Sequence, residues 1–290
     1  SEARGSYGLQ TEEGRLDARA MGGLRHRAEG DSMLPCVGDW VTWRRGENDD
    51  MAVIESVLPR FSKLSRKVAG SRAVEQVVAA NVDCVLLVMG LDGDYSPRRL
   101  ERFLVMAWES GARPVVVLNK RDLCRDVEER LDEIGNIAAG VPVLALSAKE
   151  GELSDLDDLL VSGETVVVVG SSGVGKSTLI NGLLGEERLA TAEVREGDDR
   201  GRHTTTSRSL VVLPSGALLI DSPGIRELQL WDSAAGLEDV FDDIGQLAQA
   251  CRFRDCRHDG EPGCVVVKAI EDGELDGARL QSLRGLEQEA

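Results

Sequence analysis

The chain of 290 residues is short of positive charge, histidine and long apolar runs. Its net charge of -17 argues against nucleic-acid binding through bulk electrostatics, because phosphate contacts need lysine and arginine. No apolar run approaches the roughly 20 residues of a membrane helix. The polar segment SEARGSYGLQTEEGR lacks the apolar region of a signal peptide. We therefore expect a cytoplasmic protein with no membrane association.

The negative charge is spread unevenly. Residues 1–66 hold 10 Lys and Arg against 11 Asp and Glu, so this segment is the least acidic part of the chain. If the protein touches RNA, local arginine clusters must make the contact. The candidates are Arg25, Arg27, Arg44 and Arg45 near the front and Arg252, Arg254 and Arg257 near the back. The alternative interpretation is that these are ordinary solvated arginines.

The length and the change of pattern along the chain predict a multidomain α/β protein. Residues 1–66 contain short strand-like runs at 14–20, 37–43 and 51–58, with turns expected at Gly22-Gly23, 29–31 and 47–50. This pattern favours a small β-barrel such as an OB-fold, an RNA-binding domain, although another small β domain fits equally well.

Residues 67–232 alternate between buried strands and helices. We expect strands at 84–89, 115–118, 141–146, 165–169, 210–213 and 217–220, and helices at 97–110, 126–139 and 176–184. Runs of Val, Ile and Leu between helices indicate a mostly parallel sheet covered on both faces. The motifs described below follow the carboxyl ends of these strands, where open α/β sheets bind ligands.

A phosphate-binding loop of the form GxxxxGKS lies between an expected strand and an expected helix. It comprises Gly170, Ser171, Ser172, Gly173, Val174, Gly175, Lys176 and Ser177, followed by Thr178. Its backbone N–H groups would surround the β-phosphate at the helix N-terminus. Lys176 would reach the β- and γ-phosphates, and the Ser177 hydroxyl would bind Mg²⁺.

A guanine-recognition motif comes before this loop. Asn119-Lys120-Arg121-Asp122 (NKRD) follows the strand VVVL, and Ser147-Ala148-Lys149 follows the next strand. The Asp122 carboxylate can accept from guanine N1–H and the 2-amino group, which adenine does not offer, so it would remain unpaired against ATP. Asn119 would contact the other edge of the base, the Lys120 stem would cover the ring, and Ser147-Ala148 would offer an N–H to O6.

The remaining GTPase parts come after the loop. Asp221 opens the DxxG sequence that ends at Gly224, and a threonine-rich segment lies between it and the loop. Asp221 would hold Mg²⁺ and the Gly224 N–H would sense the γ-phosphate. One threonine should also bind Mg²⁺ and release it on hydrolysis; we favour Thr205 over Thr204. Because ordinary GTPases run from loop to switches to base motif, this order predicts a circularly permuted GTPase.

The position after DxxG, where Ras-like enzymes carry a glutamine that orients water, is Ile225. Ile225 cannot do this, so either another group supplies the function or the intrinsic rate is low. His203, just before the threonines, is the best local candidate. We therefore assign the catalytic roles to His203, Lys176 and Thr205.

The cysteines divide into two sets. Cys36, Cys84 and Cys124 are scattered and are expected to be small buried hydrophobes. A second set consists of Cys251, Cys256, His258 and Cys264. This density in a cytosolic chain indicates a closed, structural, tetrahedral Zn²⁺ site in a domain covering 233–290, which ends in a helix at 278–289.

With these residues in view, the chain resembles the RsgA/YjeQ family of circularly permuted GTPases that depend on the small ribosomal subunit. The matching segments are 38–41, 57–60, 64–66, 80–83, 98–102, 115–122, 170–181, 203–206 and the Cys251/Cys256/His258/Cys264 set. The resemblance implies an OB-fold, a permuted GTPase core and a zinc domain. It also implies GTP hydrolysis stimulated by the 30S subunit during its late maturation, with contacts to 16S rRNA. The proposed catalytic histidine of the family maps onto His203.

Two functions other than a ribosome-dependent GTPase are also possible from the sequence. A P-loop ATPase or kinase would share the phosphate loop, but NKRD argues against it. An RNA-binding scaffold could use GTP only as a structural ligand, and Ile225 keeps that hypothesis open. The expected ligands are GTP or GDP, Mg²⁺ and one structural Zn²⁺, and the expected state is a monomer.

Overall fold

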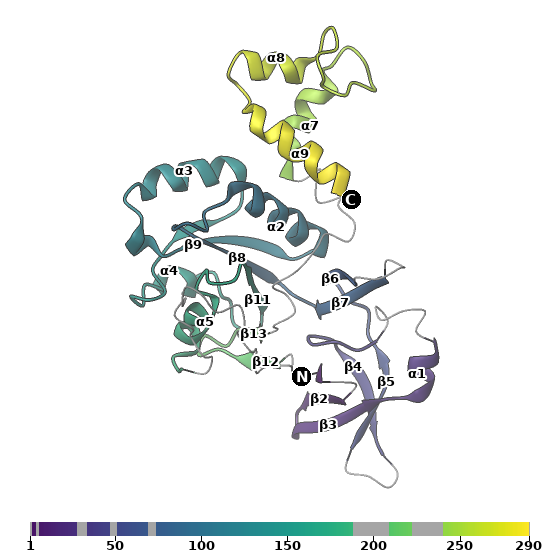
Figure 1. Ribbon diagram of the computed structural model, residues 1–290. Helices are drawn as coiled ribbons and strands as arrows, with labels where there is room; N and C mark the ends of the chain where they lie inside the picture. Colours follow the sequence, from purple (N-terminus) through teal and green to yellow (C-terminus); the bar gives the residue numbers. More distant parts are fainter. Residues whose placement is uncertain are drawn as a thin grey trace, which may run out of the picture.

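The computed structural model describes residues 2–3, 6–27, 34–46, 51–68, 74–187, 209–221 and 240–289. Within these residues the strands form a five-stranded, a six-stranded and a two-stranded sheet (Figure 1). None of the helices in this part of the chain is long and apolar enough to cross a membrane.

The N-terminal sheet has the strand order β1-β2-β3-β5-β4. Its strands are β1 (Glu2–Ala3), β2 (Ser6–Thr11), β3 (Gly14–Ala20), β4 (Val41–Arg45) and β5 (Ala52–Val57). β3 and β5 pair in parallel, and the other neighbours are antiparallel. The strand runs expected at 14–20 and 51–58 are confirmed, whereas the run expected at 37–43 is only partly correct, because residues 37–38 form a turn and β4 begins at Val41.

The turn expected at Gly22-Gly23 is wrong. These glycines begin a short helix, α1 (Gly22–Arg27), despite their poor helix propensity. Leu24 of this helix packs against the small core that contains Ala18 and Ile54, and the Met21 N–H donates to the Ile54 carbonyl at 2.9 Å. Tertiary packing therefore overrides local preference at this position.

A two-stranded sheet joins the N-terminal strands to the rest of the molecule. It consists of β6 (Lys63–Val68) and β7 (Val74–Ala80), and residue 66, where we expected the first domain to end, lies inside β6. Leu64 is buried in the same cluster as Leu100 and Leu104, which belong to the helix at residues 97–110.

The six-stranded sheet has the order β10-β9-β8-β11-β13-β12, and only β12 runs antiparallel to its neighbour. The strands are β8 (Cys84–Gly90), β9 (Arg113–Asn119), β10 (Val143–Ala145), β11 (Thr165–Gly170), β12 (Ser209–Val212) and β13 (Leu218–Asp221). The mostly parallel sheet expected from the sequence is confirmed. The chain runs outward from β8 to β10 and then returns to β11 beside β8. This reversal places a ligand-binding crevice at the carboxyl ends of β8 and β11.

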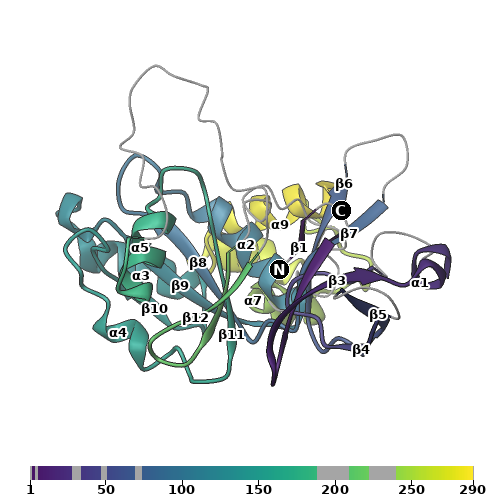
Figure 2. The same cartoon turned by 90° about the horizontal axis from the view of Figure 1, so that it is seen from below.

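Helices cover both faces of this sheet, because its strands are apolar on both sides (Figures 1 and 2). On one face α2 (Pro97–Ser110) and α3 (Val127–Ile137) pack through Leu100, Leu104 and Ile134. On the other face α4 (Ser154–Asp157) and α5 (Lys176–Leu184) pack through Leu156 and Leu179.

The C-terminal helices lie on the α2 side of the sheet (Figure 1). They are α7 (Asp242–Gln249), α8 (Val265–Glu271) and α9 (Gly277–Glu289). Phe241, Ile244 and Val266 belong to the same buried cluster as Leu104 of α2, so the C-terminal unit shares a core with the central sheet.

Candidate functional site

The phosphate loop connects β11 to α5 at the predicted position, and its geometry needs glycine at both ends. A Cβ on Gly170 would lie 2.3 Å from the Val88 carbonyl oxygen of β8. Gly175 has a φ of +97°, and a Cβ there would lie 2.3 Å from the side-chain nitrogen of Asn119. The loop therefore fits closely between the two central strands and the base motif.

The loop holds its own lysine in place. Lys176 is only 8% exposed, and its ammonium donates to the Gly170 carbonyl at 2.7 Å and also to the Ser171 carbonyl. The Ser171 hydroxyl donates to the Asp94 carboxylate. These contacts fix the ammonium at the N-terminus of α5, where a bound phosphate would meet both charge and helix dipole.

Asn119 connects three loops. It is 3% exposed, its amide nitrogen donates to the Val174 carbonyl at 2.8 Å, and its oxygen accepts from the Ala148 N–H at 3.0 Å. The base motif, the Ser147-Ala148 turn and the phosphate loop are thus held together by one side chain. Asn119 is expected from the sequence to contact the base, and in the structure its side chain also holds these loops together.

Asp122 and Lys120 are each oriented by a partner. The Ser147 hydroxyl donates to Asp122 Oδ1 at 2.7 Å. Lys120 has a left-handed backbone with a φ of 65°, and its Nζ lies 2.5 Å from Asp92 Oδ2. Burial alone would raise the pKa of Asp92, but the hydrogen bond from Lys120 holds it below its usual value. The carboxylate therefore stays ionised and anchors the lysine stem.

Sequence reasoning missed three acidic residues that organise this crevice. Asp92 and Asp94 follow the end of β8, and Glu152 accepts from the Ser147 N–H at 3.1 Å while pairing with Arg121 at 2.8 Å. Their role could have been inferred from the sequence, because Asp92 and Asp94 come just after a buried strand, as every recognised motif does.

The switch residues lie outside the described residues. This applies to His203, Thr204, Thr205, Gly224 and Ile225. Asp221 ends β13, whose backbone pairs with β11 in the register Val167 to Ile220, so the chain at Asp221 reaches the same sheet edge as the phosphate loop.

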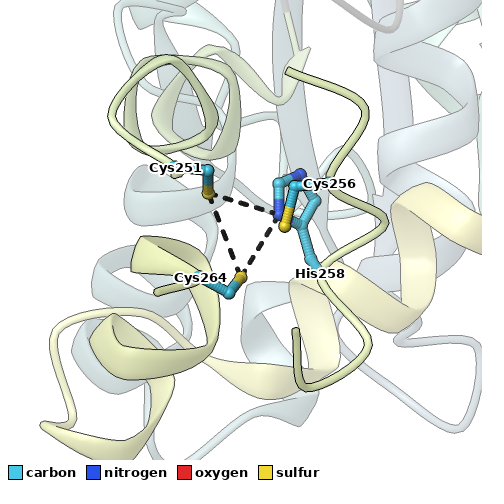
Figure 3. Close-up of side chains that lie close together, drawn as sticks. All are labelled: Cys251, Cys256, His258 and Cys264. Atoms are coloured by element: carbon cyan, nitrogen blue, oxygen red, sulfur yellow. Dashed lines mark hydrogen bonds between the residues drawn. The ribbon is translucent and has the colours of Figure 1, made fainter. Parts of the chain in front are cut away.

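The four predicted metal ligands come together (Figure 3). The ligand atoms of Cys251, Cys256, His258 and Cys264 all lie within 4.8 Å of one another. Cys251 and Cys264 sulfurs are 4.0 Å apart, and His258 Nδ1 lies 3.7 Å and 3.4 Å from them. A tetrahedral Zn²⁺ with Zn–S bonds of about 2.3 Å needs S···S edges of about 3.8 Å. The donor set and its spacing therefore fit Zn²⁺.

Backbone and carboxylate contacts support this cluster. The Val265 N–H donates to the Cys251 sulfur at 3.3 Å, and the Val267 N–H donates to the Cys264 sulfur at 3.4 Å. Backbone N–H groups, including those of residues 257 and 259, lower the pKa of Glu261 to about 2. The Glu261 carboxylate thus holds the turn between Cys256 and Cys264 through these backbone N–H groups.

The scattered cysteines are also as expected, since Cys36 and Cys84 are buried and Cys124 is partly buried. Of the arginine candidates, Arg44 pairs with Glu55 at 3.2 Å and Arg45 with Glu13 at 2.5 Å. These two arginines are exposed ion pairs, which favours the simpler surface interpretation for them.

A parallel sheet with the phosphate loop at its switch point, and with base-motif loops contributed by strands earlier in the chain, defines a circularly permuted P-loop GTPase. The family model described as RsgA GTPase matches residues 57–231. The chain belongs to the RsgA GTPase family, and it is a GTP hydrolase.

Its relatives and structural neighbours agree. Small ribosomal subunit biogenesis GTPase RsgA 2 of Lactiplantibacillus plantarum is 45% identical over 98% of this chain and 80% of its own length. RsgA of Syntrophotalea carbinolica is 46% identical over 96% of this chain and 78% of its own. The crystal structure of YjeQ from Thermotoga maritima aligns with a TM-score of 0.71 at 29% identity, covering 98% of this chain and 94% of that one. YloQ, described as a circularly permuted GTPase, aligns with a TM-score of 0.67 at 26% identity, covering 99% and 92%.

Proposed function

We propose that this GTPase binds the 30S ribosomal subunit, contacts 16S rRNA and hydrolyses GTP to drive or check a late step of small-subunit maturation in the cytoplasm, acting as a monomer. The observation that carries the proposal is the bracing of base motif, phosphate loop and Ser147-Ala148 turn by Asn119. This assembles a guanine-nucleotide site in a chain whose relatives are named for small-subunit biogenesis.

Each of the three predicted domains has its own role in this proposal. Residues 1–66 form an OB-fold, which the order β1-β2-β3-β5-β4 and the parallel β3–β5 pair support. Residues 67–232 are the permuted GTPase domain, and residues 233–290 are the zinc domain. The OB-fold and the zinc domain bind rRNA, and the GTPase domain binds and hydrolyses the nucleotide.

Exposed aromatic side chains support an RNA contact despite the acidic composition. Trp40 is 68% exposed and Phe61 is 62% exposed, close to where the N-terminal sheet ends. Arg60, in the segment that carries Phe61, makes two 2.7 Å bonds to the Asp39 carboxylate beside Trp40. Exposed aromatic faces can stack on unpaired bases without needing a large positive field.

Apart from Gly224, which lies outside the described residues, each nucleotide contact is assigned to a residue whose position the fold explains. Asp122 reads guanine N1–H and the 2-amino group, oriented by Ser147. Lys120, anchored by Asp92, covers the ring. Residues 170–175 and Thr178 surround the phosphates at the start of α5, and Lys176 neutralises their charge. The Gly224 N–H senses the γ-phosphate.

The metal ions have separate roles. Ser177, Thr205 and Asp221 would hold Mg²⁺, which supplies positive charge to the phosphates. Cys251, Cys256, His258 and Cys264 would hold a Zn²⁺ that is structural, since four protein ligands leave no open position. His203 orients the attacking water, because Ile225 cannot.

The decisive experiment measures GTP turnover of the wild type and of His203→Ala, each with and without purified 30S subunits. We expect slow turnover by the free wild type and strong stimulation by 30S. His203→Ala should keep GTP affinity and lose most of the stimulated rate, since orienting the nucleophile and stabilising charge are worth roughly 10³-fold or more. Wild-type GTP binding with no stimulated turnover would instead favour a scaffold that uses GTP as a structural ligand.

A further inference from the structure

A chain of polar contacts connects the phosphate loop to the Cys251/Cys256/His258/Cys264 cluster through α2 and α9. None of its intermediate residues takes part in the nucleotide contacts or metal ligation assigned above.

The first contact holds residue 171 from two sides. The Ser171 hydroxyl donates to the Asp94 carboxylate, while its carbonyl accepts from the Lys176 ammonium. A phosphate that binds the Lys176 ammonium would therefore weaken its hydrogen bond to the Ser171 carbonyl and displace the backbone of residue 171. Because the Ser171 hydroxyl is bonded to the Asp94 carboxylate, this displacement would also move Asp94.

The second contact links Asp94 to α2. Arg99, in the first turn of this helix, donates from Nη1 to Asp94 Oδ1 and from Nη2 to the Asp94 carbonyl, both at 2.7 Å. The Asp94 N–H also donates to Asp92 Oδ1 at 3.1 Å. A guanidinium fork on two oxygens of one residue leaves little freedom for Asp94 to move without the helix.

The third contact links α2 to α9. Glu101, two residues after Arg99, is 3% exposed; it accepts from the Ser282 hydroxyl and lies 3.6 Å from Arg279 Nη1. Arg279 also donates to both carboxylate oxygens of Asp243, at 2.8 and 3.0 Å. This buried polar group adds a specific link between α2 and the C-terminal helices to the apolar core that they share.

The last contact links α9 to the metal cluster. Arg284, just past the middle of α9, donates to the carbonyls of Arg257 at 3.1 Å and His258 at 2.9 Å. His258 is itself a predicted metal ligand. A shift of α9 along its axis would therefore displace the cysteine-rich turn.

We propose that Asp94 is a positioning residue that transmits occupancy of the phosphate loop through α2 to α9 and the metal cluster. α2 lies between the sheet and α9, with Leu100, Leu104 and Ala107 fully buried, so it moves as a rigid body rather than bending. The inference rests on the proposed nucleotide site. It gives that site a route by which nucleotide state changes the surface of the C-terminal unit.

The test is amide hydrogen exchange on the full-length, zinc-loaded protein, with and without Mg²⁺·GDP at a fixed multiple of each variant's own Kd. In the wild type, GDP should slow exchange in α9 roughly fivefold or more, the size of a modest coupling. The exchange of β3 serves as the internal reference for a global effect of ligand binding. Asp94→Asn should lose the excess protection of α9. The matched control is Asp157→Asn, an exposed position in α4 that lies outside this chain of contacts and should keep the effect on α9.

Reciprocity supplies a second measurement that a merely structural role would not move. If the sites are coupled, Ser282→Ala should change GDP affinity in the wild-type background and not in the Asp94→Asn background. Should Asp94→Asn fail to fold, Arg99→Lys, which removes the fork but keeps the charge, takes its place in both assays. Full GDP protection of α9 in the folded variant, or none in the wild type, would overturn the inference. A wild type that binds no GDP would instead refute the proposed nucleotide site.

Discussion

Guanine selectivity should depend on one carboxylate, that of Asp122. Asp122→Asn replaces an acceptor oxygen by an amide that opposes the guanine N1–H and 2-amino donors. Two hydrogen bonds to a charged group are worth about 1.5–3 kcal/mol each, so GDP affinity should fall roughly 10²- to 10⁴-fold. The same amide can donate to the 2-oxo group of xanthine, so XDP affinity should rise.

The structure provides a graded control for this prediction. Ser147→Ala removes only the 2.7 Å bond that orients Asp122 and should cost about 0.5–1.5 kcal/mol, or roughly 2- to 10-fold in GDP affinity. Titration with fluorescent GDP and competition with XDP and ADP would measure both variants. Unchanged GDP affinity in Asp122→Asn, or equal GDP and ADP affinities in the wild type, would refute the reasoning.

Three further predictions concern other parts of the molecule. Cys256→Ser should reduce bound zinc and the thermal midpoint, while GDP still binds with an affinity changed by no more than the roughly fivefold coupling proposed above; elemental analysis, melting curves and GDP titration check this, with Cys124→Ser, outside the cluster, retaining its zinc. Gly175→Ala should weaken GDP binding roughly tenfold or more through backbone strain and displacement of Asn119, whereas Gly185→Ala, also left-handed at a φ of 68° but with open space for its Cβ, should not. Arg279→Met should cost about 3–5 kcal/mol because it leaves the buried Glu101 carboxylate without its cationic partner. Burial raises the pKa of Glu101 above that of the unfolded chain, so protonation relieves this cost as the pH falls. The loss of stability should therefore shrink as pH is lowered from 8 to 5, and a constant loss would contradict this explanation.

Local patterns predicted the central sheet well. The buried runs of β8 and β11 and the amphipathic pattern of α2 each report a single physical property, burial on one or both faces. Local sequence therefore contains the information needed to place them. The phosphate loop and the cysteine-rich turn were equally accessible, because both fold around short, closely spaced motifs.

Contacts between distant segments were not predictable in the same way. Asp94 meets Ser171, 77 positions away, and Glu101 meets Ser282, 181 positions away. No periodicity in one segment encodes its partner in another. The glycines that begin α1 show the same limit, since only the packing of Leu24 against a remote core explains a helix at that position.

The rotated strand order has a consequence for synthesis of the chain. β8, buried along all seven residues, is made well before β11, its partner on one side, and Gly90 and Thr165 are about 75 residues apart. At about 5–20 residues per second, the ribosome needs several seconds to deliver β11. During that time β8 has an apolar, unpaired edge, the kind of surface on which nascent chains associate wrongly. This GTPase therefore completes its own central sheet late, and its folding yield should depend on the rate of translation between residues 90 and 165.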